Sequence, residues 1–197
     1  TLAAINFATT NTGGSTSYSW TNDTPSIGLA AAGTGTIPAF SATNIGTSPI
    51  IATIQITPNY TNNGVSCSGT ATTFTITVNP TAQVNSIANQ ILCNGTSTTA
   101  VVFSTNLTGG TTTYNWTNSN TAIGLPASGT GNINAFNVTN TTASPITATI
   151  TVTPYYSNGT PACSGPTQSF TITVNPSPAV SFSSSNQTIC SAYTSSL

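Results

Sequence analysis

The stretch Phe74-Thr75-Ile76-Thr77-Val78-Asn79-Pro80 returns unchanged as Phe170-Thr171-Ile172-Thr173-Val174-Asn175-Pro176, 96 residues further along the chain. In both copies apolar residues alternate with threonine, so the apolar side chains share one face of an extended strand. The same spacing of 96 separates Trp20 from Trp116 and Cys67 from Cys163. A period this long corresponds to a whole domain, which makes the chain an array of similar domains.

The 197 residues are almost uncharged, with no Lys, Arg, His or Met and with Asp23 as the single acidic residue, giving a formal net charge of -1. Nucleic-acid binding requires cationic side chains, so no nucleic-acid partner is expected. Calcium and zinc sites require clusters of carboxylate, Cys or His ligands, so neither a metal nor a cofactor is expected. No apolar run is long enough to span a bilayer, so direct membrane insertion is not expected either.

The composition also argues against a disordered chain, although Thr, Ser, Asn and Gly are abundant. Disordered chains combine low hydrophobicity with high charge, whereas this chain is 37% hydrophobic, 8% aromatic and only 1% charged. Its apolar residues are largely the β-branched and aromatic types that fit a pleated sheet, and no helical periodicity is visible. The sequence therefore predicts an all-β protein.

The fuller copy of the repeat, residues 81–177, predicts about seven short strands separated by turn signals. The expected strands cover one or two edge strands within 83–91 and the segments 100–105, 111–118, 134–140, 146–154 and 168–174. About seven strands in about 100 residues is typical of an immunoglobulin-like β-sandwich. We therefore expect tandem immunoglobulin-like domains, with an incomplete one at residues 1–80 and a complete one at 81–177.

The first copy has no counterpart of residues 81–96, and the segment 178–197 resembles that missing piece. Ser185-Asn186-Gln187-Thr188-Ile189-Cys190 corresponds to Ala88-Asn89-Gln90-Ile91-Leu92-Cys93. Residues 178–197 are therefore expected to be the N-terminal strand segment of a following or neighbouring domain. Either the chain is a window on a longer array, which we favour, or the tail of one copy completes the first domain of the next by strand addition.

The four cysteines leave their pairing open. A bond between Cys93 and Cys163 would close a loop inside the complete domain, and Cys67 and Cys190 would then pair outside the chain or with a neighbouring copy. The rival pairing, Cys67 with Cys93 and Cys163 with Cys190, would join neighbouring domains. We favour the intradomain bond, since each domain would then be stable alone. Oxidised pairs would place the protein outside the cytoplasm, whereas the remaining alternative is four buried thiols.

No catalytic residue is expected. Asp23 has no second carboxylate for acid–base chemistry, and no His or Lys is present to activate a nucleophile. Thr1 could act through its own amine, but it aligns with an ordinary turn residue, Ser97. The Gly-Thr-Gly triplets at 33–35 and 129–131 lack the lysine of a phosphate-binding loop, which favours turn or bulge glycines.

The aromatic residues divide into a core set and a surface set. Trp20 and Trp116 each follow a tyrosine by two positions, so Tyr18, Tyr114 and the two tryptophans are expected in the core. Tyr60, Tyr155 and Tyr156 follow prolines near a predicted loop and are the candidates for surface contact, including contact with glycans. Several Asn-x-Ser/Thr sequons occur, but a chain this rich in Asn and Thr contains them by chance.

The motifs together resemble one known family. They are Cys-Asn-Gly at 93–95, Tyr-Asn-Trp-Thr-Asn at 114–118, Ile-Gly-Leu at 123–125, Gly-Thr-Gly-Asn-Ile at 129–133, Cys-Ser-Gly at 163–165 and the strand ending at Pro176. They look like the PKD-like repeats of Bacteroidota surface proteins. The resemblance covers nearly the whole chain, and it implies immunoglobulin-like sandwiches in a long secreted adhesin and no catalytic residues to carry over.

The sequence therefore predicts a non-enzymatic structural repeat of a bacterial extracellular filament or surface adhesin. We expect a rigid, disulfide-stabilised rod whose partners are adjacent repeats or copies of itself, joined head to tail. Without ionic contacts, such an assembly should tolerate high salt and chelators. The alternative is a multivalent glycan-binding module of a cell-surface adhesin.

Overall fold

The computed structural model describes residues 1–159, 162–181 and 191. It is all-β and sandwich-like, with two single-turn helices. The elements are β1 Ser15–Asn22, η1 Pro25–Ile27, β2 Ala32–Thr34, β3 Ile50–Asn62, β4 Val65–Ser68, β5 Thr72–Val78, β6 Gln90–Cys93, β7 Thr111–Asn118, η2 Thr121–Ile123, β8 Ser128–Thr130, β9 Ile146–Ser157, β10 Cys163–Ser164 and β11 Gln168–Asn175.

The strands form two separate sheets, one in each half of the chain. In the first sheet the order is β2-β1-β3-β4, and β5 pairs with β3 on the same edge as β4, opposite β1. In the second sheet the order is β6-β11-β9-β7-β8, and β10 pairs with β9. All pairings are antiparallel except that of β6 with β11, which is parallel. We call residues 1–80 the first module and residues 81–177 the second module.

Each sheet is covered on its apolar face by extended segments that pair only at isolated bridges. Leu2 bridges to Phe40 in the first module, and Val101 bridges to Ile133 in the second. Two separate clusters of buried side chains lie between these layers, one around Trp20 and Ile54 and the other around Trp116 and Ile150. Each module therefore has its own hydrophobic core.

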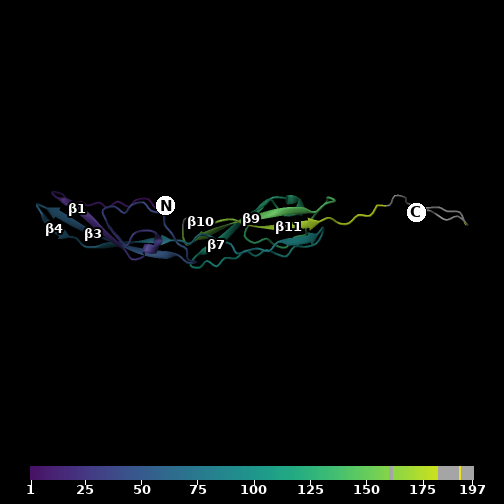
Figure 1. Ribbon diagram of the computed structural model, residues 1–197, viewed down its shortest axis with the longest axis horizontal. Helices are drawn as coiled ribbons and strands as arrows, with labels where there is room; N and C mark the ends of the chain where they lie inside the picture. Colours follow the sequence, from purple (N-terminus) through teal and green to yellow (C-terminus); the bar gives the residue numbers. More distant parts are fainter. Residues whose placement is uncertain (160–161, 182–190, 192–197) are drawn as a thin grey trace.

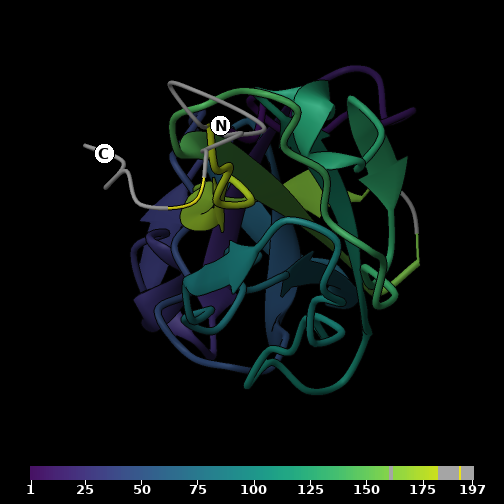
Figure 2. The ribbon, with the colours of Figure 1, turned by 90° about the vertical axis from the view of Figure 1, so that its right-hand side faces the viewer.

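The two modules lie end to end, and their strands run roughly along the long axis of the molecule (Figure 1). Viewed along that axis, the second module lies in front of the first (Figure 2). At the junction the backbone N–H of Thr108 donates to the carbonyl oxygen of Thr47 at 2.8 Å. Pro49 packs beside Gly109, where an added Cβ would lie 2.8 Å from the proline Cδ.

Several predicted strands are present with nearly the expected bounds, but the predicted strands 100–105 and 134–140 are reduced to isolated bridges. The segments 111–118 and 168–174 match β7 and β11, and β9 extends the predicted 146–154 to Ser157. The segment 100–105 pairs regularly only at Val101. The side-chain oxygen Oδ1 of Asn132 accepts the N–H of Phe103 at 2.9 Å, so a side chain takes the place of the next backbone partner.

Candidate functional site

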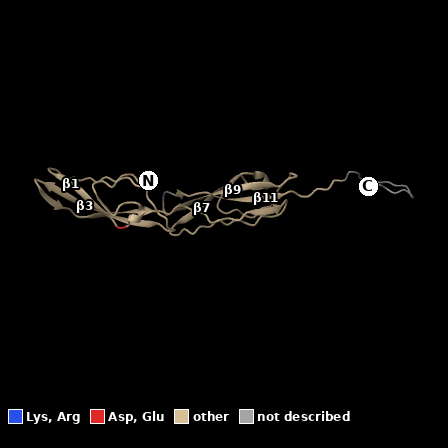
Figure 3. Ribbon diagram, viewed as in Figure 1, with Lys and Arg blue, Asp and Glu red and all other residues tan. Residues whose placement is uncertain are grey.

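Asp23, the one acidic residue, lies just after β1 (Figure 3), and its side chain makes a structural contact there. Its Oδ1 accepts hydrogen bonds from the backbone N–H of Thr53 and the hydroxyl of Thr24, both at 2.8 Å. The Thr53 N–H, followed by the Thr24 hydroxyl, lowers the pKa of this exposed carboxyl. Ser119 Oγ takes the same place in the second module, where it accepts the N–H of Thr149 at 2.8 Å. The contact therefore does not depend on the charge.

The other residues considered for chemistry also have structural surroundings. Gly33 and Gly129 lie over the indole rings of Trp20 and Trp116, where an added Cβ would be 2.2 Å from Cζ2 of the ring in each module. Thr1 is exposed at the start of the segment that bridges to Phe40. In the described part of the chain, no three His, Cys, Asp or Glu residues are close enough to form a metal site.

The four aromatic residues expected in the core do not have the same burial. Trp20, Trp116 and Tyr114 are buried, whereas Tyr18 is only half-buried. Burial raises the pKa of the Tyr114 phenol, because the ionised form loses its hydration. The indole nitrogens of both tryptophans have no hydrogen-bond partner among the described residues, a feature that the sequence did not indicate.

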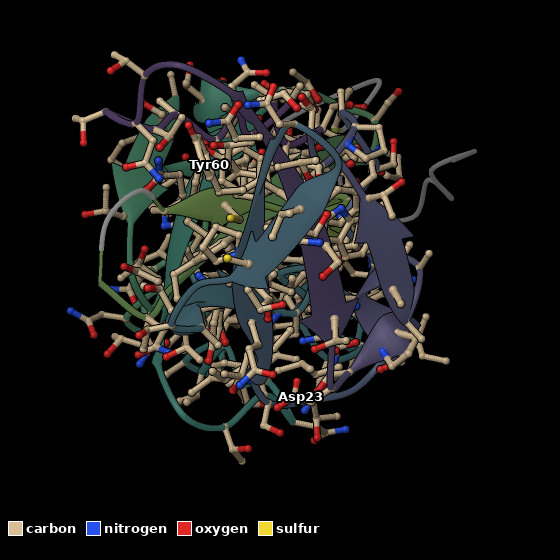
Figure 4. All side chains as sticks on the ribbon, turned by 90° about the vertical axis from the view of Figure 1, so that its left-hand side faces the viewer. Asp23 and Tyr60 are labelled. Atoms are coloured by element: carbon tan, nitrogen blue, oxygen red, sulfur yellow. The ribbon has the colours of Figure 1, made fainter. Side chains whose placement is uncertain are left out.

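Of the three tyrosines expected at the surface, Tyr156 is fully buried, so it cannot serve as an exposed platform. Its hydroxyl donates to the carbonyl oxygen of Thr108 at 2.7 Å, at the junction with the first module. Its counterpart Tyr60 makes the same bond to Thr12 at 2.8 Å but stays half-buried at the free end of the first module (Figure 4). Tyr155 is half-buried as well.

The cysteine positions do not fit the expected bond between Cys93 and Cys163. Cys93 lies opposite Asn175 at the far end of the second module, and Cys163 lies opposite Tyr156 at the junction end. Roughly ten residues of β9 separate the two ends, which is about 30 Å at the rise of a strand. A disulfide requires Cα atoms within about 7 Å. The predicted bond between Cys93 and Cys163 within one domain is therefore wrong.

The rival pairing within one chain does not fit either, because Cys67 lies opposite Tyr60 at the free end of the first module and Cys93 at the opposite end of the molecule. Cys67, Cys93 and Cys163 are exposed free thiols rather than buried ones. Cys190 and the segment 185–190 lie outside the described residues.

The main hollow of the first module is a groove lined by residues from both layers. It encloses a cavity of about 640 Å³ lined by Phe7, Tyr18, Pro58, Tyr60, Cys67 and Gly69, among others. In the second module the matching space is filled by the chain itself. Ala82 is fully buried there, and its carbonyl oxygen lies where a Cβ on Gly165, the counterpart of Gly69, would be only 1.8 Å away.

The segment that fills this space in the second module is residues 81–93, which we call the covering segment. Val84, Ile87 and Leu92 pack against the core, and the N–H of Asn85 donates to the carbonyl oxygen of Ser104 at 2.8 Å. Its last four residues form β6 on the outer edge of β11. In the first module the equivalent edge belongs to β5, and no described residue pairs with it.

The first module has no described covering segment, and its core residues are more exposed than the equivalent residues of the second module. Phe103, Tyr114, Phe170 and Ile172 are buried in the second module, whereas their counterparts Phe7, Tyr18, Phe74 and Ile76 are only partly buried. The arrangement beneath is otherwise kept: the ring centroids of Phe7 and Tyr18 are 5.3 Å apart, and those of Phe103 and Tyr114 are 5.4 Å apart. The groove is therefore preformed.

Two polar atoms of the first module are left unpaired at this groove. The hydroxyls of Thr16 and Tyr18, which both line the groove, are buried and have no hydrogen-bond partner among the described residues. Buried polar atoms normally have partners, so both atoms indicate a surface that another segment covers. The sequence indicates the missing segment but not the groove, because burial at Tyr18 depends on contacts across both layers.

Neither short helix in the described residues is long and apolar enough to cross a membrane. Comparison with protein-family models, with curated proteins and with solved structures found no match for this chain.

Proposed function

We propose that the chain is a passive structural subunit of an extracellular filament or surface adhesin, built from tandem immunoglobulin-like modules that join head to tail. The observation that carries this proposal is the groove of the first module, which is matched in the second module by a space filled with residues 81–93. A module that exposes part of its core and one edge of its sheet is a site for strand addition.

The two ends of the molecule support the same proposal. Tyr156 is buried where the modules meet, and its counterpart Tyr60 is half-buried at the free end. A further module against that end would bury Tyr60 in the same way. Repetition of the internal junction between copies would therefore extend the rod without any new kind of contact.

A non-enzymatic role in an extracellular, bacterial setting accompanies this proposal. The described side chains offer no base close to a nucleophile, and the one carboxylate takes part in a turn contact that Ser119 makes equally well. A nearly uncharged surface of hydroxyl and amide groups suits a protein whose contacts must hold at varied ionic strength, because screening acts on charges.

The test is assembly of the purified chain at increasing protein concentration. Sedimentation velocity is expected to show mass growing with concentration, and negative-stain electron microscopy is expected to show filaments one molecule wide. Both should persist in 1 M salt (about 3 Å screening length) and in chelator. A chain that stays monomeric at every concentration would contradict the proposal.

A glycan-binding module is the second candidate, and the cavity that Tyr18 and Tyr60 help to line is the observation in its favour. Aromatic faces next to hydroxyl and amide groups are the usual surroundings of a sugar ring. Binding to a glycan array that disappears in Tyr60→Ala and persists in Tyr155→Ala would support this candidate.

A further inference from the structure

The second module shows which interactions hold the end of a covering segment. Cys93 lies opposite Asn175 in the parallel ladder of β6 with β11. Just before it, Asn89 Oδ1 accepts the N–H of Thr171 at 2.8 Å. The side chain of Gln90 pairs with the backbone of Thr99, accepting its N–H at 3.0 Å and donating to its oxygen at 3.1 Å. Asn, Gln and Cys therefore have defined roles in this segment.

The first module presents the same groups, and no described residue lies opposite them on the open edge of β5. The counterparts of Thr171, Thr99 and Asn175 are Thr75, Ala3 and Asn79, and the Oδ1 of Asn79 has no partner among the described residues. The tail sequence Asn186-Gln187-Thr188-Ile189-Cys190 keeps Asn, Gln and Cys at the spacing of residues 89–93. It has Thr188 where Ile91 is 74% exposed and Ile189 where Leu92 packs on the core.

The tail leaves the molecule at the end opposite the groove, so the groove of its own chain is out of reach. Residues 178–181 lead away from the second module, on the side remote from the first (Figure 1). To return, the tail would have to pass the whole second module, which is about 40 Å along the 12 residues of β9 alone. The roughly ten residues before Asn186 would be used up by that distance, so a groove that this tail fills belongs to a second copy.

The internal junction indicates how the second copy would be placed. Its hydrogen bond joins Thr108 to Thr47, and the counterparts of these residues are Thr12, at the free end of the first module, and Ala143, at the far end of the second. The glycine–proline contact of Gly109 with Pro49 has counterparts in Gly13 and Pro145. The same end-to-end contact can therefore form between two molecules.

The cysteines meet in this arrangement. Cys163 and Asn79 line one cavity of about 370 Å³ at the internal junction. A strand laid on β5 in the register of β6 would put its cysteine opposite Asn79, beside Cys163. At the junction between copies, Cys93 of the donor lies opposite Asn175, the counterpart of Asn79, and Cys67 of the acceptor is the counterpart of Cys163.

Resting on the proposed head-to-tail assembly, we propose that residues 177–190 of one copy fill the groove of the next. We further propose that two interchain disulfides lock each junction: donor Cys190 to acceptor Cys163, and donor Cys93 to acceptor Cys67. Each bond forms as two thiols lose two protons and two electrons. A small-molecule disulfide such as oxidised glutathione accepts them and leaves as two thiols. All four cysteines are then used.

The experiment mixes two full-length variants that each keep one cysteine. The donor carries Cys67→Ser, Cys93→Ser and Cys163→Ser, and the acceptor carries Cys67→Ser, Cys93→Ser and Cys190→Ser. With oxidised glutathione, the mixture is expected to form the disulfide heterodimer at least tenfold faster than either variant forms a homodimer. Non-reducing gels measure the rate, and mass spectrometry of chymotryptic peptides identifies the bond, because the chain has no trypsin site.

A matched pair of donors tests the register. Asn186→Ala with Gln187→Ala removes the side chains that would pair with Thr75 and Ala3, and should slow heterodimer formation about tenfold. Thr188→Ala changes the position equivalent to the exposed Ile91 and should leave the rate unchanged. Equal slowing by both donors, or homodimers as fast as heterodimers, would overturn the inference.

The unmodified chain separates this inference from the proposed function. Oxidised filaments should yield the peptide pairs Cys67–Cys93 and Cys163–Cys190. Filaments that form with other pairs or with free thiols would overturn the inference and leave head-to-tail assembly standing. Absence of any assembly would overturn both.

Discussion

Gly129 lies directly on the indole ring of Trp116: a Cβ built on the glycine would be 2.2 Å from Cζ2 of the ring. The two residues are paired across β7 and β8, and Gly33 and Trp20 repeat the relationship in the first module with the same distance. The Gly-Thr-Gly triplets are therefore part of the core packing around each tryptophan.

Substitution of Gly129 by alanine should lower the free energy of unfolding by about 1–3 kcal/mol, because the added methyl group overpacks a buried ring. Urea unfolding followed by tryptophan fluorescence measures the change. Ser128→Ala, at the neighbouring exposed position of β8, is the control and should change the stability by less than about 0.5 kcal/mol. Equal stability of the two variants would contradict the packing argument.

Asn140 holds three backbone groups through one buried side chain, two in its own turn and one on β11. Its Nδ2 donates to the carbonyl oxygens of Val174 at 2.8 Å and Ser144 at 2.9 Å, and its Oδ1 accepts the N–H of Thr142 at 2.9 Å. Asn140→Ala would leave these groups unpaired and should cost about 2 kcal/mol of unfolding free energy. Asn137→Ala, at an exposed position with no side-chain hydrogen bond among those described, is the control in the same urea experiment.

The acid dependence of stability should come from Asp23. The pKa of this carboxyl is lowered in the folded chain, so its contribution is fully present above its unfolded pKa, about 3.9, and is lost as the pH falls through the folded value. Urea midpoints compared at pH 7 and about pH 2 should therefore differ for the natural chain.

Asp23→Ser is the matched variant, because Ser119 makes the same contact in the second module without a charge. This variant should keep the stability of the natural chain at pH 7 and lose the acid-dependent difference. A difference of unchanged size would assign the acid dependence to another group.

One substitution placed in both modules separates folding from assembly. Gly165→Ala would direct a Cβ to within 1.8 Å of the carbonyl oxygen of Ala82, so it should destabilise the second module by about 3 kcal/mol. Gly69→Ala adds the same methyl group to the groove, where its nearest contact is the ring of Pro58 at 2.9 Å. It should leave most of the folding stability and shift filament formation to at least tenfold higher protein concentration.

Thermal unfolding and sedimentation measured on both variants distinguish the two effects. If Gly69→Ala assembles as well as the natural chain, then no segment fills the groove in the way that residues 81–93 fill the equivalent space of the second module.

The sequence-based predictions succeeded where local pattern decides the structure. The alternation from Phe170 to Val174 is enough to locate β11, since period-two burial needs no knowledge of the partner strand. The predicted strand at 100–105 was wrong beyond Val101, because Asn132 supplies a side-chain acceptor that no pattern in that segment reveals. The all-β class follows from composition and alternation together.

The cysteine pairing depends on strand direction, which spacing along the chain does not encode. β6 runs parallel to β11, and this direction places Cys93 at the far end of the module rather than beside Cys163. An antiparallel edge strand with the same sequence would have brought the two thiols toward each other. The burial of Tyr156 was missed for a related reason, since it arises at the contact between modules.

The strands lie roughly along the long axis of the molecule, and this direction decides how a module would respond to a pull (Figure 1). In the second module the chain enters at the junction and leaves beyond β11 at the far end, so a pull along the axis would make β6 and β11 slide past each other. Sliding breaks many hydrogen bonds at once, whereas a pull across the sheet would peel them one at a time. The second module is therefore oriented to yield late under such a pull.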